Sequence, residues 1–242
     1  MNIAVAEMDW GQARLSDIRD LLENTASHLN RYMRYPFAGT IAIVPSPPGD
    51  PHPMVQYRTN SQDPFVVHLS ARDRRWSQFA FQFSHEFCHV LSGYERLRDN
   101  PNNWFHEALC ELASVFTLRR MAKTWPTHPP YPNWRDYAVH LADYAAERLS
   151  YEESQLPKGQ TLRSWLCDKE NELREDPYQR QLNGVAAYSL LPLFEANPTG
   201  WNAIPDLPDS DSKLHTYLGQ WIASVSSQDR ALPESILDAF SE

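Results

Sequence analysis

The sequence predicts an α+β fold, in which a small mixed sheet precedes a longer helical region. Three short runs rich in β-branched and apolar residues lie between residues 40 and 70, and each has the length of a strand. From residue 76 onward, apolar residues recur at three- and four-residue steps, which is the period of amphipathic helices. We therefore expect an α+β N-lobe over residues 1–100 and an all-α C-lobe over residues 101–242, joined in one compact unit.

Composition indicates a globular protein. The chain has 242 residues, of which 42% are hydrophobic and 12% aromatic, so it can bury a sizeable core. A net charge of −9 without a basic patch argues against nucleic acid and anionic membranes as partners. The first ten residues lack the basic segment of a signal peptide, and three cysteines are too few for a disulfide framework. These observations predict a cytoplasmic protein.

The first 75 residues contain the expected strands. An opening helix is predicted over residues 9–34, followed by a buried strand over 40–44. Residues 45–53 contain five prolines and must form a loop. Two further strands are predicted over residues 54–59 and 65–70.

The region after residue 132 is predicted to be helical. Residues 125–132 hold four prolines and form an irregular connection before it. The helices that follow are expected at residues 134–149, 162–174, 178–191 and 214–225, with a short one after Pro233. Pro192 should kink or end the third of them.

The strongest local pattern is the segment His85-Glu86-Phe87-Cys88-His89. It lies in a predicted helix over residues 76–92, with Gly93 as the C-terminal cap. Histidines at positions i and i+4 project from one face of a helix, so both imidazoles can reach one zinc ion. A third ligand must then come from another segment.

A second helix, predicted from Asn103 to about Lys123, can supply that ligand. It places Glu107 and Glu111 on one face, since they stand four residues apart. Carboxylates on a helix face are usually solvated, but these two lie among apolar residues. The pairing of the two helices therefore favours a metal site.

The HExxH segment followed by a glutamate-bearing helix resembles the gluzincin metallopeptidases, the group of the thermolysin-like and aminopeptidase-N-like enzymes. The resemblance implies a zincin-like fold with zinc held by His85, His89 and Glu107. It implies Glu86 as the general base and Glu111 as a residue that steadies a ligand histidine. It covers residues 64–122, and in its layout the strand over residues 65–70 forms the edge of the cleft.

The resemblance implies a zinc-dependent metallopeptidase that hydrolyses a peptide or protein substrate. The glycine-led motif of exopeptidases is missing upstream of the metal helix, which favours an endopeptidase or an enzyme of narrow specificity. Gluzincins also use a tyrosine or histidine of the helical lobe as donor to the tetrahedral intermediate. Tyr178 is our first choice for that donor and Tyr188 our second, with His128, His140 and other tyrosines as further candidates.

Other readings of the same residues stay open. The chain could be a catalytically inactive zincin-fold module that binds metal or a partner protein. It could also hold a purely structural zinc, for which His106 is the nearby candidate for a fourth ligand. Cys88 and Cys110 are interpreted as small buried hydrophobes, and His68 as a structural histidine.

Overall fold

The computed structural model describes residues 1–47, 49, 52–97 and 99–242, and it has a mixed α/β fold with a small four-stranded sheet. Its contacts divide the chain into two compact units. Unit 1 comprises residues 1–90 and 113–147, and unit 2 comprises residues 91–112 and 148–242. The expected lobes, residues 1–100 and 101–242, were defined by their content of strands and helices, whereas these units are defined by contacts. The expected lobes therefore stay a prediction.

The sheet belongs to unit 1 and has the strand order β1-β2-β4-β3. Strand β2 (Thr40–Pro45) pairs in parallel with β1 (Asn2–Val5) and with β4 (Phe65–Leu69). The two-residue strand β3 (Met54–Val55) pairs with β4 in antiparallel fashion. Strand β1 was not predicted, because four residues at the start of the chain carry too short a pattern.

Two expectations for this sheet are wrong. The strand predicted over residues 54–59 is only two residues long. Strand β4 is not the edge of the sheet at Val67 and His68, because β3 covers it there. His68 contacts the Gln56 amide, as expected of a structural histidine. The expected loop 45–53 begins one residue later, since β2 includes Pro45, and residues 48, 50 and 51 of it lie outside the described part of the chain.

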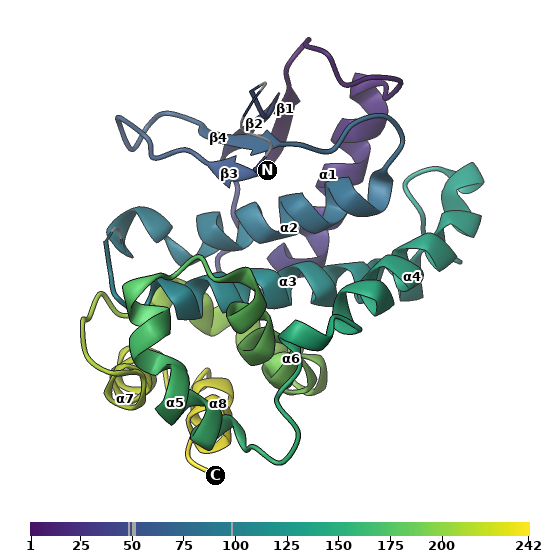
Figure 1. Ribbon diagram of the computed structural model, residues 1–242. Helices are drawn as coiled ribbons and strands as arrows, with labels where there is room; N and C mark the ends of the chain where they lie inside the picture. Colours follow the sequence, from purple (N-terminus) through teal and green to yellow (C-terminus); the bar gives the residue numbers. More distant parts are fainter. Residues whose placement is uncertain (48, 50–51, 98) are drawn as a thin grey trace. The chain divides into compact units, whose positions relative to one another are not determined.

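Helices α1 (Leu15–Asn30) and α2 (Trp76–Ser92) lie on one side of the sheet within unit 1 (Figure 1). The opening helix is shorter than predicted at both ends. Before it, Gly11 adopts a φ of +65° and donates to the side chain of Asp9, which makes a turn. After it, the Asn30 side chain pairs with the backbone of Phe37.

Helix α2 has the predicted bounds because its sequence specifies both its core face and its end. One flank packs aromatic rings into the core, and Phe83 stacks on Phe87 with centroids 5.7 Å apart. Gly93 follows the last turn with a φ of +67°, a conformation that favours glycine over residues with a side chain. The expected cap is confirmed.

Helix α3 (Asn103–Thr124) also has the predicted bounds, and its second half belongs to unit 1. There, the hydroxyl of Ser114 donates a 2.9 Å hydrogen bond to the carbonyl of Phe81 on α2. The helix expected over residues 134–149 begins as a 3₁₀ segment (Pro132–Tyr137) and continues as α4 (Ala138–Leu149). Trp134 of the 3₁₀ segment stacks on Trp76.

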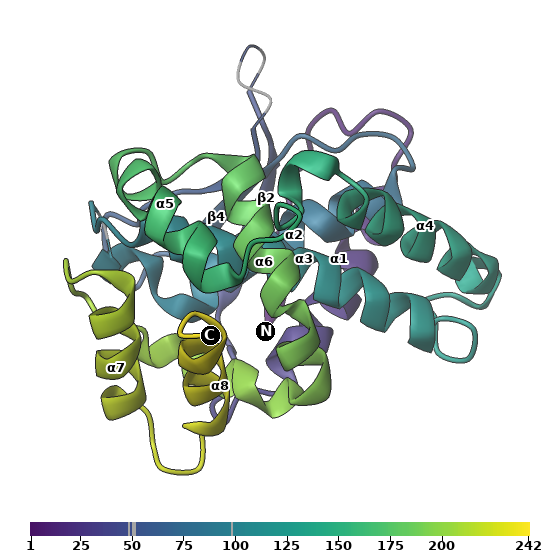
Figure 2. The same cartoon turned by 60° about the horizontal axis from the view of Figure 1, so that its bottom comes forward.

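Unit 2 is helical. After the first half of α3, its main elements are α5 (Leu162–Glu175), α6 (Arg180–Ala196), α7 (Leu214–Ser224) and α8 (Ala231–Ala239). Helices α7 and α8 lie side by side (Figure 2). Shorter 3₁₀ segments are found at Tyr94–Leu97, Glu152–Ser154 and Pro198–Asp206. Pro192 does not end α6, because the helix continues to Ala196, and the other expected outcome, a kink at Pro192, stays a prediction.

Aromatic residues form the core of unit 2. The ring of Phe105 on α3 contacts Tyr217, Trp221 and Phe240 at centroid distances of 6.2, 6.2 and 6.4 Å. No described helix has the length and apolar character that crossing a membrane requires.

Candidate metal centre

Helix α2 places the two motif histidines one turn apart. The ring centroids of His85 and His89 are 5.0 Å apart, and the rings are tilted by 66°. Both side chains are half-buried, because the opposite flank of the helix turns its aromatic residues into the core. Two imidazoles that share one accessible helix face are suited to binding one metal ion.

Glu86 lies between the histidines in the chain and is only 3% exposed. A buried carboxylate must be compensated by polar partners or by a cation, because removing its charge from water is costly. The expected general base is therefore a carboxylate largely shielded from solvent, beside two half-buried imidazoles.

Helix α3 places three further potential ligands on one face. Glu107 is half-buried, whereas Cys110 and Glu111 are buried. Cys110 and Glu111 stand three and four positions after Glu107. Their side chains therefore project within about 60° of the Glu107 side chain around the helix axis. One turn of α3 thus carries two carboxylates and one thiol.

Two histidines of unit 1, His85 and His89, and Cys110 of unit 2 are residues of the kinds that hold a metal ion. Among the described residues, Glu107 is not part of this group. Cys110 was expected to act as a small hydrophobe, and its 1% exposure agrees with burial. Its thiol is nevertheless chemically suited to be a third ligand, and Glu107 stands one turn before it on the same helix.

Glu111 is bonded to two residues that the sequence pattern did not connect with it. One of its carboxylate oxygens accepts a 3.0 Å ion-pair hydrogen bond from Arg148 and a 2.6 Å hydrogen bond from the hydroxyl of Tyr188. Burial, followed by the negative charge of Glu111, raises the pKa of Tyr188 above its usual range. The hydroxyl therefore keeps its proton and acts as a donor.

His106 is engaged elsewhere in unit 2. It is 3% exposed, and its Nε2 atom lies 2.7 Å from the hydroxyl of Tyr217. Burial raises the pKa of Tyr217, so that hydroxyl is also protonated. This contact gives His106 a structural role in the core of unit 2.

Tyr178 lies outside the helix that was expected to begin with it. Its backbone N–H donates to the Asp176 side chain in a turn, and α6 starts two residues later at Arg180. Its side chain is 70% exposed. Tyr188, by contrast, lies inside α6 and contacts the face of α3 that carries Glu107 and Glu111.

Sequence reasoning missed Arg148, Tyr217 and the position of the Cys110 thiol. Arg148 is one of 22 basic residues, and no spacing links it to Glu111 at a separation of 37 positions. For Cys110 a signal did exist, since it stands three residues after Glu107 on the same helical face.

None of the three cysteines forms a disulfide within the described residues, as their number had indicated.

Comparisons with protein-family models, with curated proteins and with solved structures gave no match to this chain. Its function is therefore inferred from the residues of the site and their geometry.

Proposed function

We propose that this protein is a zincin-like, zinc-dependent metallopeptidase. In this proposal His85, His89 and Glu107 hold the metal, and Glu86 is the general base. The observation that carries it is the pair of half-buried imidazoles one turn apart, with a buried glutamate between them. Packing of the helix does not require two imidazoles on this face, whereas binding of a metal ion does.

The donor set fits zinc. Imidazole, carboxylate and thiolate are its usual protein ligands, at 2.0–2.3 Å from the ion. In such a site zinc polarises the substrate carbonyl and lowers the pKa of a bound water.

Side chains of the protein would transfer the proton and stabilise the intermediate. Glu86 would accept a proton from the attacking water and deliver it to the leaving amine. A tyrosine of the helical region would donate a hydrogen bond to the developing oxyanion. Tyr178 is the donor expected from the sequence, and Tyr188 is the alternative, although its O–H proton would first have to leave Glu111.

The position of Cys110 favours a second candidate function. If both Glu107 and Cys110 bound zinc beside the two histidines, four protein ligands would close the site. Closed four-ligand sites are structural, whereas catalytic sites keep one position open for water. The protein would then be an inactive zincin-fold module that binds metal or a partner protein.

Metal content and the spectrum of the cobalt-substituted protein test the ligand set. We expect about one equivalent of zinc in the wild type and its loss in His89→Ala, since one of three ligands is gone. Glu107→Gln should release the metal, whereas Cys110→Ser should retain it. Cobalt-loaded wild type should show no thiolate-to-metal charge-transfer band.

A charge-transfer band that disappears in Cys110→Ser would instead place the thiol on the metal. Together with zinc loss from Glu107→Gln, that result would favour the closed, inactive site. Full zinc retention in His89→Ala would contradict both candidates.

A further inference from the structure

A row of contacts joins α1 to the second half of α3 within unit 1. The hydroxyl of Thr25 lies 3.6 Å from the sulfur of Met121. Seven residues further along the chain, the ring of Tyr32 packs edge-on against Phe116, with centroids 6.2 Å apart. Residue numbers rise on one side of this row and fall on the other, so the two segments run antiparallel. The residues between the two contacts therefore face one another.

Helical spacing brings three polar residues into this interface. His28 stands three residues after Thr25, so its side chain projects from the same face of α1. On α3, Thr117 and Arg120 lie within the arc of about 140° that separates the two residues in contact with α1. The charge of Arg120 acts on His28 across the interface, which agrees with this placement. We call His28, Thr117 and Arg120 the His28 cluster.

Four polar atoms of the His28 cluster are buried without a hydrogen-bond partner among the described residues. They are both ring nitrogens of His28, the hydroxyl oxygen of Thr117 and the Nε atom of Arg120. His28 is 2% exposed and Thr117 is 0% exposed. Folded proteins pair the great majority of their buried polar groups, because an unpaired one loses its bonds to water without replacement. Four unpaired atoms in one interface therefore point to a polar ligand.

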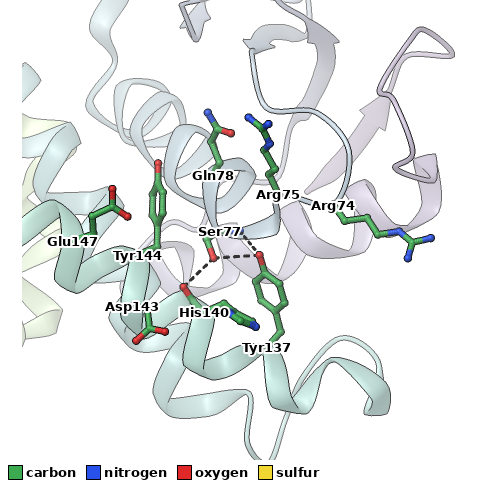
Figure 3. Close-up of a pocket in the computed structure, with 9 residues that line it drawn as sticks. All are labelled: Arg74, Arg75, Ser77, Gln78, Tyr137, His140, Asp143, Tyr144 and Glu147. Carbon is green, nitrogen blue, oxygen red and sulfur yellow. Dashed lines mark hydrogen bonds between the residues drawn. The ribbon is translucent and has the colours of Figure 1, made fainter.

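The interface of α2 with α4 in the same unit shows the usual arrangement. Ser77 is buried there, and its backbone N–H donates to the hydroxyl of Tyr137 at 3.3 Å. The Ser77 hydroxyl donates to the carbonyl of His140 at 3.2 Å (Figure 3). Protein groups alone pair the polar atoms of Ser77, whereas they do not pair those of the His28 cluster.

The charges around the His28 cluster favour an anion as the ligand. Burial, and then the positive charges of Arg31 and Arg120, lower the pKa of His28 to about 3, and no described carboxylate opposes them. Neither arginine forms an ion pair with a described residue. The Nε atom of Arg31 donates to the carbonyl of Ser27, and Arg120 has no hydrogen bond to the described residues. An anion in this interface would compensate both guanidinium groups and favour the protonated imidazole.

We propose that the His28 cluster binds one small oxyanion, such as phosphate or sulfate, and that His28 takes up a proton as the anion binds. The Thr117 hydroxyl, the Nε–H group of Arg120 and a ring N–H of His28 donate hydrogen bonds to its oxygens. Arg120 is half-buried, so its side chain connects the site with solvent. No residue of the metal motif takes part, so the inference is independent of the proposed peptidase function.

Isothermal titration calorimetry of the whole chain with sulfate at pH 5.5 tests the site, with chloride at equal ionic strength as the baseline. We expect one sulfate per chain and the uptake of about one proton, because the ring of free His28 is neutral at this pH. Titrations in two buffers of different ionisation enthalpy give the number of protons. The affinity should fall by up to about tenfold per pH unit above the pKa that His28 has in the complex.

Variants assign the anion to the cluster. Thr117→Val keeps the volume of the side chain without its hydroxyl, and Arg120→Gln removes the guanidinium group. Each should weaken sulfate binding by about tenfold or more. His28→Gln should abolish the proton uptake. Arg14→Gln removes an exposed arginine before α1 and should behave as wild type, and circular dichroism checks that each variant is folded.

Three results would overturn the proposal. Absence of saturable sulfate binding to wild type at pH 5.5 would show that the cluster binds water only. Unchanged sulfate affinity in both Thr117→Val and Arg120→Gln would show an adventitious ion only, bound elsewhere on the surface. Sulfate binding to wild type without proton uptake would exclude His28 from the site.

Discussion

The hydroxyl of Tyr188 donates a 2.6 Å hydrogen bond to the carboxylate of Glu111, one turn beyond Glu107 on α3. The same carboxylate oxygen accepts from Arg148, so the tyrosine is fixed by a buried ion pair. Because burial raises the pKa of Tyr188, the hydroxyl stays protonated throughout the neutral range. The single O–H proton of Tyr188 is donated to Glu111, so Tyr188 can serve as an oxyanion donor only if this hydrogen bond is released.

A pair of Tyr→Phe variants decides which tyrosine serves as donor. Loss of the donor should lower kcat by about 10²–10³ at unchanged zinc content. The sequence points to Tyr178 first and to Tyr188 second, and the Tyr188 proton must leave Glu111 before it can reach an oxyanion. Steady-state kinetics of Tyr178→Phe and Tyr188→Phe give the answer, and near-wild-type kcat in both would remove tyrosine from the mechanism at these positions.

Removing Arg148 should destabilise the protein strongly. Arg148→Met leaves Glu111 buried without its cation, which costs about 3–5 kcal/mol in the free energy of unfolding. The double variant Arg148→Met/Glu111→Leu should recover much of that loss, since no uncompensated charge remains. Urea unfolding measures both values.

Lys169→Met is the matched control for this change. It removes a lysine that forms a 2.7 Å ion pair with Glu172 at the surface of α5, and such pairs contribute about 0–1 kcal/mol. Equal losses in Arg148→Met and Lys169→Met would show that the buried pair has no special role.

His106 should be dispensable for metal binding. His106→Gln disturbs the contact with Tyr217, so the free energy of unfolding should fall by about 1–3 kcal/mol. Zinc content measured by elemental analysis should stay at that of the wild type. Loss of zinc from a folded variant would restore His106 as a ligand and support a structural zinc.

His28 on α1 should make stability depend on pH. It is 2% exposed, and neither ring nitrogen has a hydrogen-bond partner among the described residues. Burial, and then the charges of Arg31 and Arg120, lower the pKa of His28 to about 3. The unfolded chain binds this proton near pH 6.5 while the folded protein does not, so stability falls as the pH drops from 6.5 towards 3.

The variant His28→Leu should remove that part of the pH dependence. Relative to wild type, it should gain about 2 kcal/mol between pH 7.5 and pH 5, as measured by urea unfolding at both values. His215→Gln, at an exposed position of α7, should follow the wild type. An identical pH dependence in His28→Leu and wild type would contradict the neutral, buried state of His28.

The two motif helices were predictable because each carries a complete apolar stripe with a clear end. Gly93 ends α2 through its backbone conformation, and the bounds of α3 follow from its apolar period. The start of α6 was misjudged because the Asp176 side chain captures the N–H of Tyr178 in a turn. Pro192 did not end α6, since it lies on the exposed side of the helix, where solvent can replace the lost hydrogen bond.

The candidate site was predictable only where it depends on spacing within one helix. His85 and His89 share a face of α2 because they stand four residues apart. The contact between Arg148 and Glu111 joins residues 37 positions apart, and that between Tyr188 and Glu111 joins residues 77 apart. Such contacts depend on tertiary packing, which cannot be predicted from helical periodicity.

The turnover of Glu86→Gln at full zinc occupancy tests the central claim most directly. Glutamine keeps the size and shape of the side chain but cannot accept the proton from water. We predict unchanged zinc content and a kcat/KM for peptide hydrolysis lower by about two to four orders of magnitude, the contribution of a general base. Equal kcat/KM in wild type and Glu86→Gln would contradict the assignment of Glu86 and the metallopeptidase mechanism built on it.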